Sequence, residues 1–142
     1  MSVEYFIDTN LFIYPLERLD QRKADIAERL IEKGIATGNT CISFQVVQEC
    51  LNTAIRKAEI PLTTDAMKRY LNTVLMPLYR IQPNLNLYLA AVDIQARYRF
   101  AFYDSLIVSA ALEAGCKVLY SEDMRHGQQI EGLAIENPFI SG

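Results

Sequence analysis

Short apolar segments alternate along this chain with longer amphipathic ones. The apolar segments are rich in β-branched and aromatic residues, which is typical of strands buried on both faces of a parallel sheet. Their spacing predicts one strand near each end of the chain and three between them. We expect these strands at residues 3–7, 40–42, 79–82, 117–121 and 133–136.

The amphipathic segments repeat apolar residues every three or four positions, the spacing that places them on one face of a helix. Gly34 and Gly115 follow two of these segments and are expected to end them. Ser43 is a candidate N-cap, Pro15 is expected to stop a short helix, and Pro61 is expected to end the region after the third helix. The predicted helices are 11–16, 20–33, 44–58, 64–75, 87–98 and 103–114.

Strands that alternate with helices predict an α/β fold, a three-layer α/β/α sandwich with a central parallel sheet. The 142 residues contain no linker or internal repeat, so we expect a single domain over 1–142. No apolar run reaches the roughly 18 residues of a membrane span, and the first residues lack the pattern of a secretory signal. Three widely spaced cysteines, which form no zinc pattern, suit a reducing compartment. We therefore expect a cytoplasmic protein without a membrane partner.

Four carboxylates fall where predicted strands end or predicted helices begin. Asp8 follows the first strand, Asp123 lies just beyond the fourth, and Asp104 is in the first turn of its helix. Glu49 is in the second turn of the helix after the second strand. Each acid alone could cap a turn, complement a helix dipole or face solvent. Because ligands of open α/β sheets bind beyond the carboxyl ends of the strands, the four together predict one site.

A cluster of four carboxylates is electrostatically costly. Two carboxylates about 4 Å apart repel by about 4 kcal/mol at an effective dielectric of 20, against a domain stability of about 5–15 kcal/mol. Such a cluster requires bound protons or a cation. The donors are oxygens only, and His126 is the single histidine, so Mg²⁺ or Mn²⁺ is favoured over zinc or iron. These ions, held by carboxylates, hydrolyse phosphodiesters. The net charge of −3 provides no general basic coat for nucleic acid but leaves room for a local basic rim.

Four motifs in order resemble those of PIN-domain ribonucleases, and within them the VapC-type toxins of bacterial toxin–antitoxin pairs. The motifs are Phe6–Phe12, Val46–Glu49, Phe102–Ile107 and Leu119–Met124, and the tail Asn137–Phe139 is also similar. The resemblance implies strand order 3-2-1-4-5 and Mg²⁺- or Mn²⁺-dependent endonuclease action on RNA. It also implies a cognate antitoxin whose tail blocks the site, and a homodimer.

The resemblance also implies individual roles. Glu122 stands beside Asp123, so the fourth ligand has two candidates; adjacent residues near a strand end point opposite ways, and only one should face the site. The family's pattern makes Asp8, Glu49, Asp104 and Asp123 the metal-site acids, with Thr9, Asn10 and Ser121 orienting them through hydrogen bonds.

Other residues and functions have weaker support. Arg97 and Arg99 could hold RNA phosphates, or could simply be a solvated helix end. Segment 11–16 and the stripe of Met67, Tyr70, Leu71 and Val74 are expected in the core; if exposed, they could form a dimer or antitoxin surface.

Two alternative functions remain open. A Mg²⁺-dependent phosphatase-like phosphoryl-transfer enzyme needs a second acid two residues after the nucleophile, where this chain has Asn10. A catalytically inactive RNA-binding module is disfavoured by the complete set of four acids. The chain has no Gly-rich phosphate loop, which disfavours dinucleotide and NTP enzymes.

Overall fold

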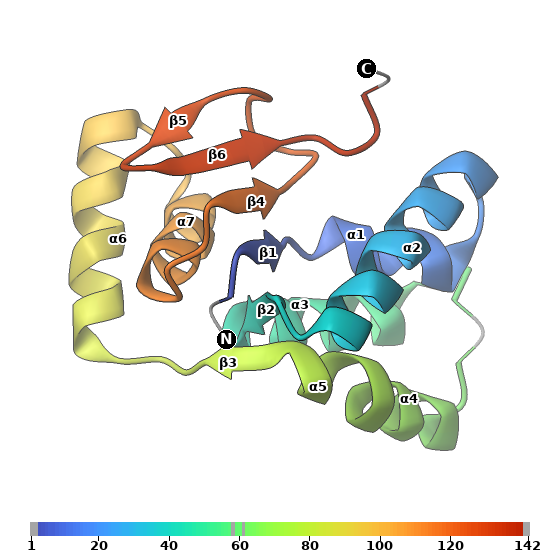
Figure 1. Cartoon of the computed structure of the whole chain (residues 1–142). Helices are drawn as coiled ribbons and strands as arrows, with labels where there is room; N and C mark the ends of the chain where they lie inside the picture. Colours follow the sequence, from blue (N-terminus) through green and yellow to red (C-terminus); the bar gives the residue numbers. More distant parts are fainter. Residues whose placement is uncertain (1–2, 58, 61, 141–142) are drawn as a thin grey trace.

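The strands form one sheet in the order β3-β2-β1-β4-β6-β5 (Figure 1). The computed structural model describes residues 3–57, 59–60 and 62–140. Strands β3, β2, β1, β4 and β6 are parallel, whereas β5 is antiparallel to β6. The strands are β1 (Tyr5–Ile7), β2 (Thr40–Ser43), β3 (Tyr79–Ile81), β4 (Val118–Tyr120), β5 (Gln129–Ile130) and β6 (Leu133–Glu136).

Helices flank this sheet, which confirms the predicted α/β class and, for the five predicted strands, their order (Figure 1). Helices α1 and α2 pack against each other, and so do α6 and α7. No helix in the described ranges is both long and apolar enough to cross a bilayer. The helices are α1 (Asn10–Glu17), α2 (Gln21–Thr37), α3 (Phe44–Arg56), α4 (Thr64–Tyr70), the π-helix η1 (Leu71–Leu75), α5 (Met76–Leu78), α6 (Leu85–Tyr98) and α7 (Phe102–Glu113).

One strand at the edge of the sheet, β5, was not predicted; it is antiparallel to β6. This strand has only two residues and joins β6 through a tight turn at Glu131 and Gly132, whose φ angles are 49° and 90°. Turns with two positive φ angles favour Asn-Gly or Asp-Gly. The Glu-Gly pair present here is a weaker signal, and two residues are too few for an alternating pattern.

The predicted stop of α1 at Pro15 is also wrong. Pro15 lies inside the helix, which ends at Arg18, where φ is 50° and the backbone N–H donates to the Tyr14 carbonyl. A proline in a helix removes one hydrogen bond. Burial of Leu11 and Phe12 outweighs that loss, since packing supplies most of the stability of a short helix.

Gly34 does not end α2, contrary to prediction. The helix continues to Thr37 and is capped by Gly38, whose φ is 73°. Gly34 is buried against β2, where a Cβ atom would lie 2.7 Å from the Cβ of Thr40. The glycine therefore permits a close approach of helix and strand rather than a turn.

The ends of α3 and α4 differ from prediction in smaller ways. Helix α3 ends at Arg56 instead of residue 58; Ala58 and Pro61 lie outside the described residues. Ser43 precedes α3 as predicted, but its side chain makes no cap hydrogen bond. The helix predicted at 64–75 begins at Thr64 and continues through η1 and α5 to Leu78.

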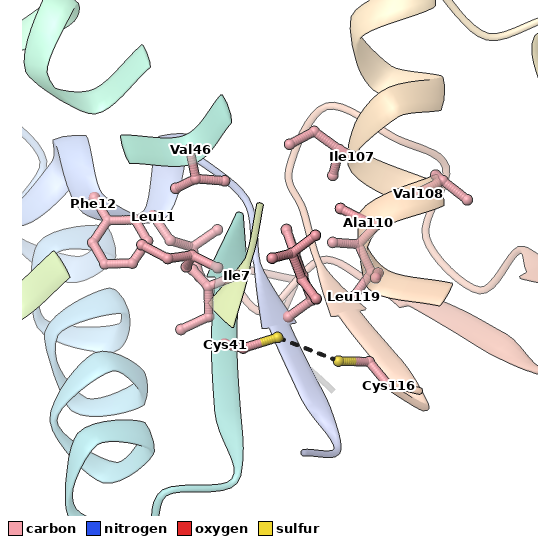
Figure 2. Close-up of a cluster of buried hydrophobic side chains, with 14 of the residues drawn as sticks. Ile7, Leu11, Phe12, Cys41, Val46, Ile107, Val108, Ala110, Cys116 and Leu119 are labelled. Atoms are coloured by element: carbon pink, nitrogen blue, oxygen red, sulfur yellow. Dashed lines mark hydrogen bonds between the residues drawn. The ribbon is translucent and has the colours of Figure 1, made fainter. Parts of the chain in front are cut away.

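The core lies between the sheet and its helices. Figure 2 draws part of it, with side chains of α1, α3 and α7 around Ile7 of β1 and Leu119 of β4. In the same view the thiols of Cys41 and Cys116 face each other with their Sγ atoms 3.7 Å apart, and both are free. Ile55 on α3 is 69% exposed. The stripe on α4 and η1 is partly buried against the core, as expected; it comprises Met67, Tyr70, Leu71 and Val74.

Candidate active site

Asp8 is a buried carboxylate at the end of the central strand β1. Its backbone N–H donates to the carbonyl of Tyr120 (2.9 Å), which carries the β1–β4 pairing one residue beyond the strand. Its Oδ1 accepts a hydrogen bond from the Thr9 N–H (2.7 Å), and its Oδ2 accepts one from the Ser121 hydroxyl (2.9 Å). Two donors therefore fix the carboxylate at the carboxyl edge of the sheet, the edge that the sequence predicts for the site.

Burial raises the pKa of Asp8 to about 7. The hydrogen bonds from Thr9 and Ser121 favour the ionised form and lower the pKa, but the negative charges of Asp123 and Glu49 raise it further. Asp8 thus carries a proton for much of the time at neutral pH.

Glu49 and Asp123 come from different elements and are each held by a residue at the start of α1. The Thr9 hydroxyl donates to Oε1 of Glu49 on α3 (2.8 Å). The Asn10 amide donates to Oδ2 of Asp123, in the loop after β4 (2.8 Å). Together with the Ser121 bond to Asp8, each of the three predicted orienting residues donates to a different acid.

Asp104 is the fourth acid and lies in the first turn of α7, where the helix dipole favours a carboxylate. Its pKa is raised, first by burial and then by the charges of Asp123 and Glu49. The start of α7 is tied to α3, because the side-chain amide of Gln45 donates to the carbonyl of Tyr103 (3.1 Å). Asp104 and Glu49 line the same cavity.

One cavity of about 230 Å³ brings the four acids together. Its wall draws on the residues after β1, on α1, α3 and α7, and on the loop after β4, so residues more than a hundred positions apart meet in it. The lining residues are Asp8, Thr9, Asn10, Gln45, Glu49, Asn52, Thr53, Arg56, Asp104, Ile107 and Asp123.

Glu122 and Asp123 point to different surroundings. Glu122 accepts hydrogen bonds from the Tyr14 hydroxyl and forms an ion pair with Lys23, away from the cavity. The ammonium of Lys23 also lies over the rings of Tyr14 (5.1 Å) and Phe139 (5.4 Å). Of the two candidates that the sequence left open for the fourth ligand, only Asp123 lines the cavity.

The basic residue in the cavity wall is Arg56, which the sequence interpretation missed. A signal was available, since Asn52, Thr53 and Arg56 follow Glu49 by three, four and seven positions, which places them on one face of α3. Arg97 lines a different cavity of about 410 Å³ beside α6 and α7, and Arg99 ends α6 with φ 64°.

His126 is likewise not among the residues that line the acidic cavity. Its Nδ1 accepts a hydrogen bond from the backbone N–H of Asn137 (3.0 Å), which fits a local structural role.

The donor set of the cavity fits a hard, hydrated cation. Mg²⁺ is usually held by one or two carboxylates and keeps several waters. In residues 3–57, 59–60 and 62–140, no three His, Cys, Asp or Glu side chains are grouped closely enough to hold one ion together. An ion bound through one or two of the acids, and through water to the others, is consistent with both observations.

Solved structures of similar fold cover nearly the whole chain. A toxin–antitoxin complex from Klebsiella pneumoniae is 16% identical, with a TM-score of 0.67 over 96% of this chain and 98% of that one. A DNA-bound VapBC from Salmonella typhimurium is 20% identical (TM-score 0.65; 94% and 97% covered). VapC20 of Mycobacterium tuberculosis, a sarcin-ricin loop cleaving toxin, is 18% identical (TM-score 0.59; 84% and 90% covered).

Sequence comparison gives the family. No curated protein sequence matches the chain significantly. A family model, however, matches residues 5–129, from the start of β1 to the start of β5, and that model is the PIN domain. The chain belongs to the PIN domain family.

Proposed function

We propose that this PIN-domain protein is an endoribonuclease that depends on Mg²⁺ or Mn²⁺. The observation that carries the proposal is the acidic cavity. Four carboxylates from four separate segments line it, and the burial of Asp8, together with the charges of Asp123 and Glu49, raises the pKa of Asp8 to about 7. Such an arrangement costs stability unless a cation enters it, and cations held by carboxylates are the usual means of cleaving phosphodiesters.

The proposed roles follow from the contacts of each residue. When bound, a divalent ion would supply charge neutralisation at the phosphate and a more acidic water. The side chains of Thr9, Asn10 and Ser121 each donate to one acid and so orient its carboxylate. The acids that would hold the ion are Asp8, Glu49, Asp104 and Asp123.

The test is cleavage of a mixed cellular RNA pool by the purified chain with Mg²⁺, with Mn²⁺ and with EDTA. We expect cuts with either metal, none with EDTA, and none from Asp8→Asn, which keeps the shape of the side chain but removes its charge. Asp25→Asn is the matched control, because Asp25 is exposed on α2 and contacts only surface residues. Equal activity of Asp8→Asn and wild type would contradict the site. Metal-dependent RNA binding without cleavage would favour a binding module instead.

We further propose that the protein is a VapC-type toxin with a cognate antitoxin and forms a homodimer. The support is that the similar structures above include a toxin–antitoxin complex and a VapBC complex that match over almost the whole chain. Expression of the wild-type chain alone should stop growth, Asp8→Asn should not, and co-expression of a protein encoded beside it should restore growth. Analytical ultracentrifugation checks the dimer.

A further inference from the structure

We infer that Arg56 binds a phosphate of the substrate strand that flanks the cleaved bond; this inference rests on the proposed ribonuclease function. Arg56 is the basic residue among those that line the acidic cavity. It lies in the last turn of α3, and its side chain is exposed.

The side of α3 that faces the cavity is polar from Glu49 to Arg56. Glu49, Asn52, Thr53 and Arg56 all line the cavity, whereas Val46, Cys50 and Ala54, on the adjoining side of the helix, are buried in the core. Because α3 is anchored by that apolar side, its polar side is held in a fixed direction. The polar side chains along α3 therefore lead from Glu49 to Arg56 at the edge of the cavity.

Arg56 is not a structural counter-ion of the acids. Within the described part of the chain, no ion pair of 4.0 Å or less joins Arg56 to any carboxylate. The adjacent Lys57 is different, because its ammonium pairs with Glu17 at 2.9 Å. The guanidinium of Arg56 thus keeps its donors available at the rim of the cavity.

The chemistry of the rim selects a phosphate. Four carboxylates repel a polyanion, and the net charge of −3 offers no general attraction. An arginine fork matches the geometry of phosphate oxygens and provides two parallel hydrogen bonds. A single well-placed cation is therefore worth more at this rim than on a basic surface.

The position of Arg56 favours a phosphate that flanks the cleaved bond over the phosphate that is cleaved. Seven residues separate Glu49 from Arg56, a rise of about 10 Å along the helix. A cavity of about 230 Å³ is smaller than the roughly 300–1,000 Å³ that holds a drug-sized ligand, so only a small part of a nucleic acid enters it. Asn52 and Thr53, between the two charges, offer an amide and a hydroxyl to the backbone that leaves the cavity.

The first test measures binding without cleavage. A labelled pool of random single-stranded 12-nucleotide RNA is titrated with Asp8→Asn protein by fluorescence anisotropy at several salt concentrations. Adding Arg56→Ala should weaken binding about tenfold at low salt and reduce the slope of log K against log salt by about 1. Arg56→Lys should recover part of the loss. Arg69→Ala, which removes an exposed arginine of α4 outside the cavity, should change neither quantity.

The second test separates a flanking phosphate from the cleaved one. On a short RNA with one mapped cut, Arg56→Ala in the otherwise wild-type chain should raise KM about tenfold and leave kcat within about twofold, because uniform binding is lost. A fall in kcat at unchanged KM would overturn the assignment to a flanking phosphate. Unchanged binding by Arg56→Ala, with RNA still bound by the parent, would refute the role of Arg56 while leaving the nuclease intact. Failure of the parent to bind RNA at all would refute the proposed function itself, and the inference with it.

Discussion

Two adjacent residues of one loop, Glu122 and Asp123, serve different parts of the protein. The ion pair of Glu122 with Lys23 and its bond from Tyr14 fasten the loop to α1 and α2. The bond to Glu122 raises the pKa of Lys23 and so favours the charged ammonium. By fastening the loop, Glu122 helps to hold Asp123 in the cavity, although Glu122 itself lies outside it.

Glu122→Gln and Asp123→Asn should therefore have opposite effects. Glu122→Gln breaks a half-buried ion pair and should lower the free energy of unfolding by about 1 kcal/mol, with cleavage within about threefold of wild type. Asp123→Asn removes charge repulsion, so it should not destabilise the fold. It should cut activity by more than about 100-fold, because even partners of ligands cost about 10- to 100-fold. Urea unfolding and initial cleavage rates measure the pair; if Glu122→Gln were the inactive variant, the fourth site acid would have to be reassigned.

At the scale of residues, position along the chain predicted the acids of the cavity better than its basic residue. Asp8 and Asp123 could be placed because residues after parallel strands share one edge of the sheet. Arg97 and Arg99, the arginines that were predicted to hold RNA phosphates, do not line the cavity. Arg56 required helical phase relative to Glu49, a relation that the residue type alone does not show.

At the scale of elements, the contact of α2 with β2 depends on one missing side chain. Thr40 is 4% exposed, and its hydroxyl donates to the side chain of Asn39 (3.0 Å), so its rotamer is held in place. A methyl group on Gly34 would collide with Thr40, and the helix or the strand would have to move. Because β2 leads directly into α3, such a shift would also displace Glu49.

Gly34→Ala should lower the free energy of unfolding by about 1–3 kcal/mol, the usual cost of overpacking. The sign of this change in unfolding free energy is diagnostic, because replacing glycine by alanine within a helix otherwise stabilises the protein by about 1 kcal/mol. Glu32→Ala, on the exposed part of the same helix, should stay within about 0.5 kcal/mol of wild type. Urea titrations at constant m-value compare the two, and a more stable Gly34→Ala protein would show that Thr40 yields easily.

Element types could be predicted from the sequence, but element ends were less secure. Apolar segments rich in β-branched residues identified the five parallel strands, and apolar residues repeated every three or four positions identified most helices, because both patterns report burial directly. The helix ends predicted at Pro15 and Gly34 were wrong. At Pro15 the burial of neighbouring residues outweighed the local preference for ending a helix, and at Gly34 the glycine serves a close approach of helix and strand. The short β5 depends on a hairpin turn whose sequence signal is weak.

At the scale of the whole molecule, the acidic cavity links stability to pH. The pKa of Asp8 is about 7 in the folded protein, well above its ordinary value of 3.8. Between these values the folded state binds a proton that the unfolded state releases. Its contribution therefore makes the folded state more stable as pH falls from about 7 towards 4, and less stable above that range.

Asp8→Asn should remove this dependence. In EDTA, the free energy of unfolding of wild type relative to the variant should fall as pH rises from about 4 to 7, by up to about 1.4 kcal/mol per pH unit. Above pH 7 the variant should be the more stable protein. Urea unfolding at pH 5, 6, 7 and 8 measures the difference, with Asp25→Asn as control. Parallel curves for wild type and Asp8→Asn would show that Asp8 ionises normally.

The small strand β5 also affects how copies of the chain meet one another. Without it, β6 would present a row of unpaired N–H and C=O groups, which can template the addition of a strand from another copy. Residues Gln129 and Ile130 occupy those groups opposite Ala134 and Leu133, and two residues are too few to template a further strand. This edge of the sheet is therefore closed to aggregation by strand addition, a protection that matters most when the chain is made in excess.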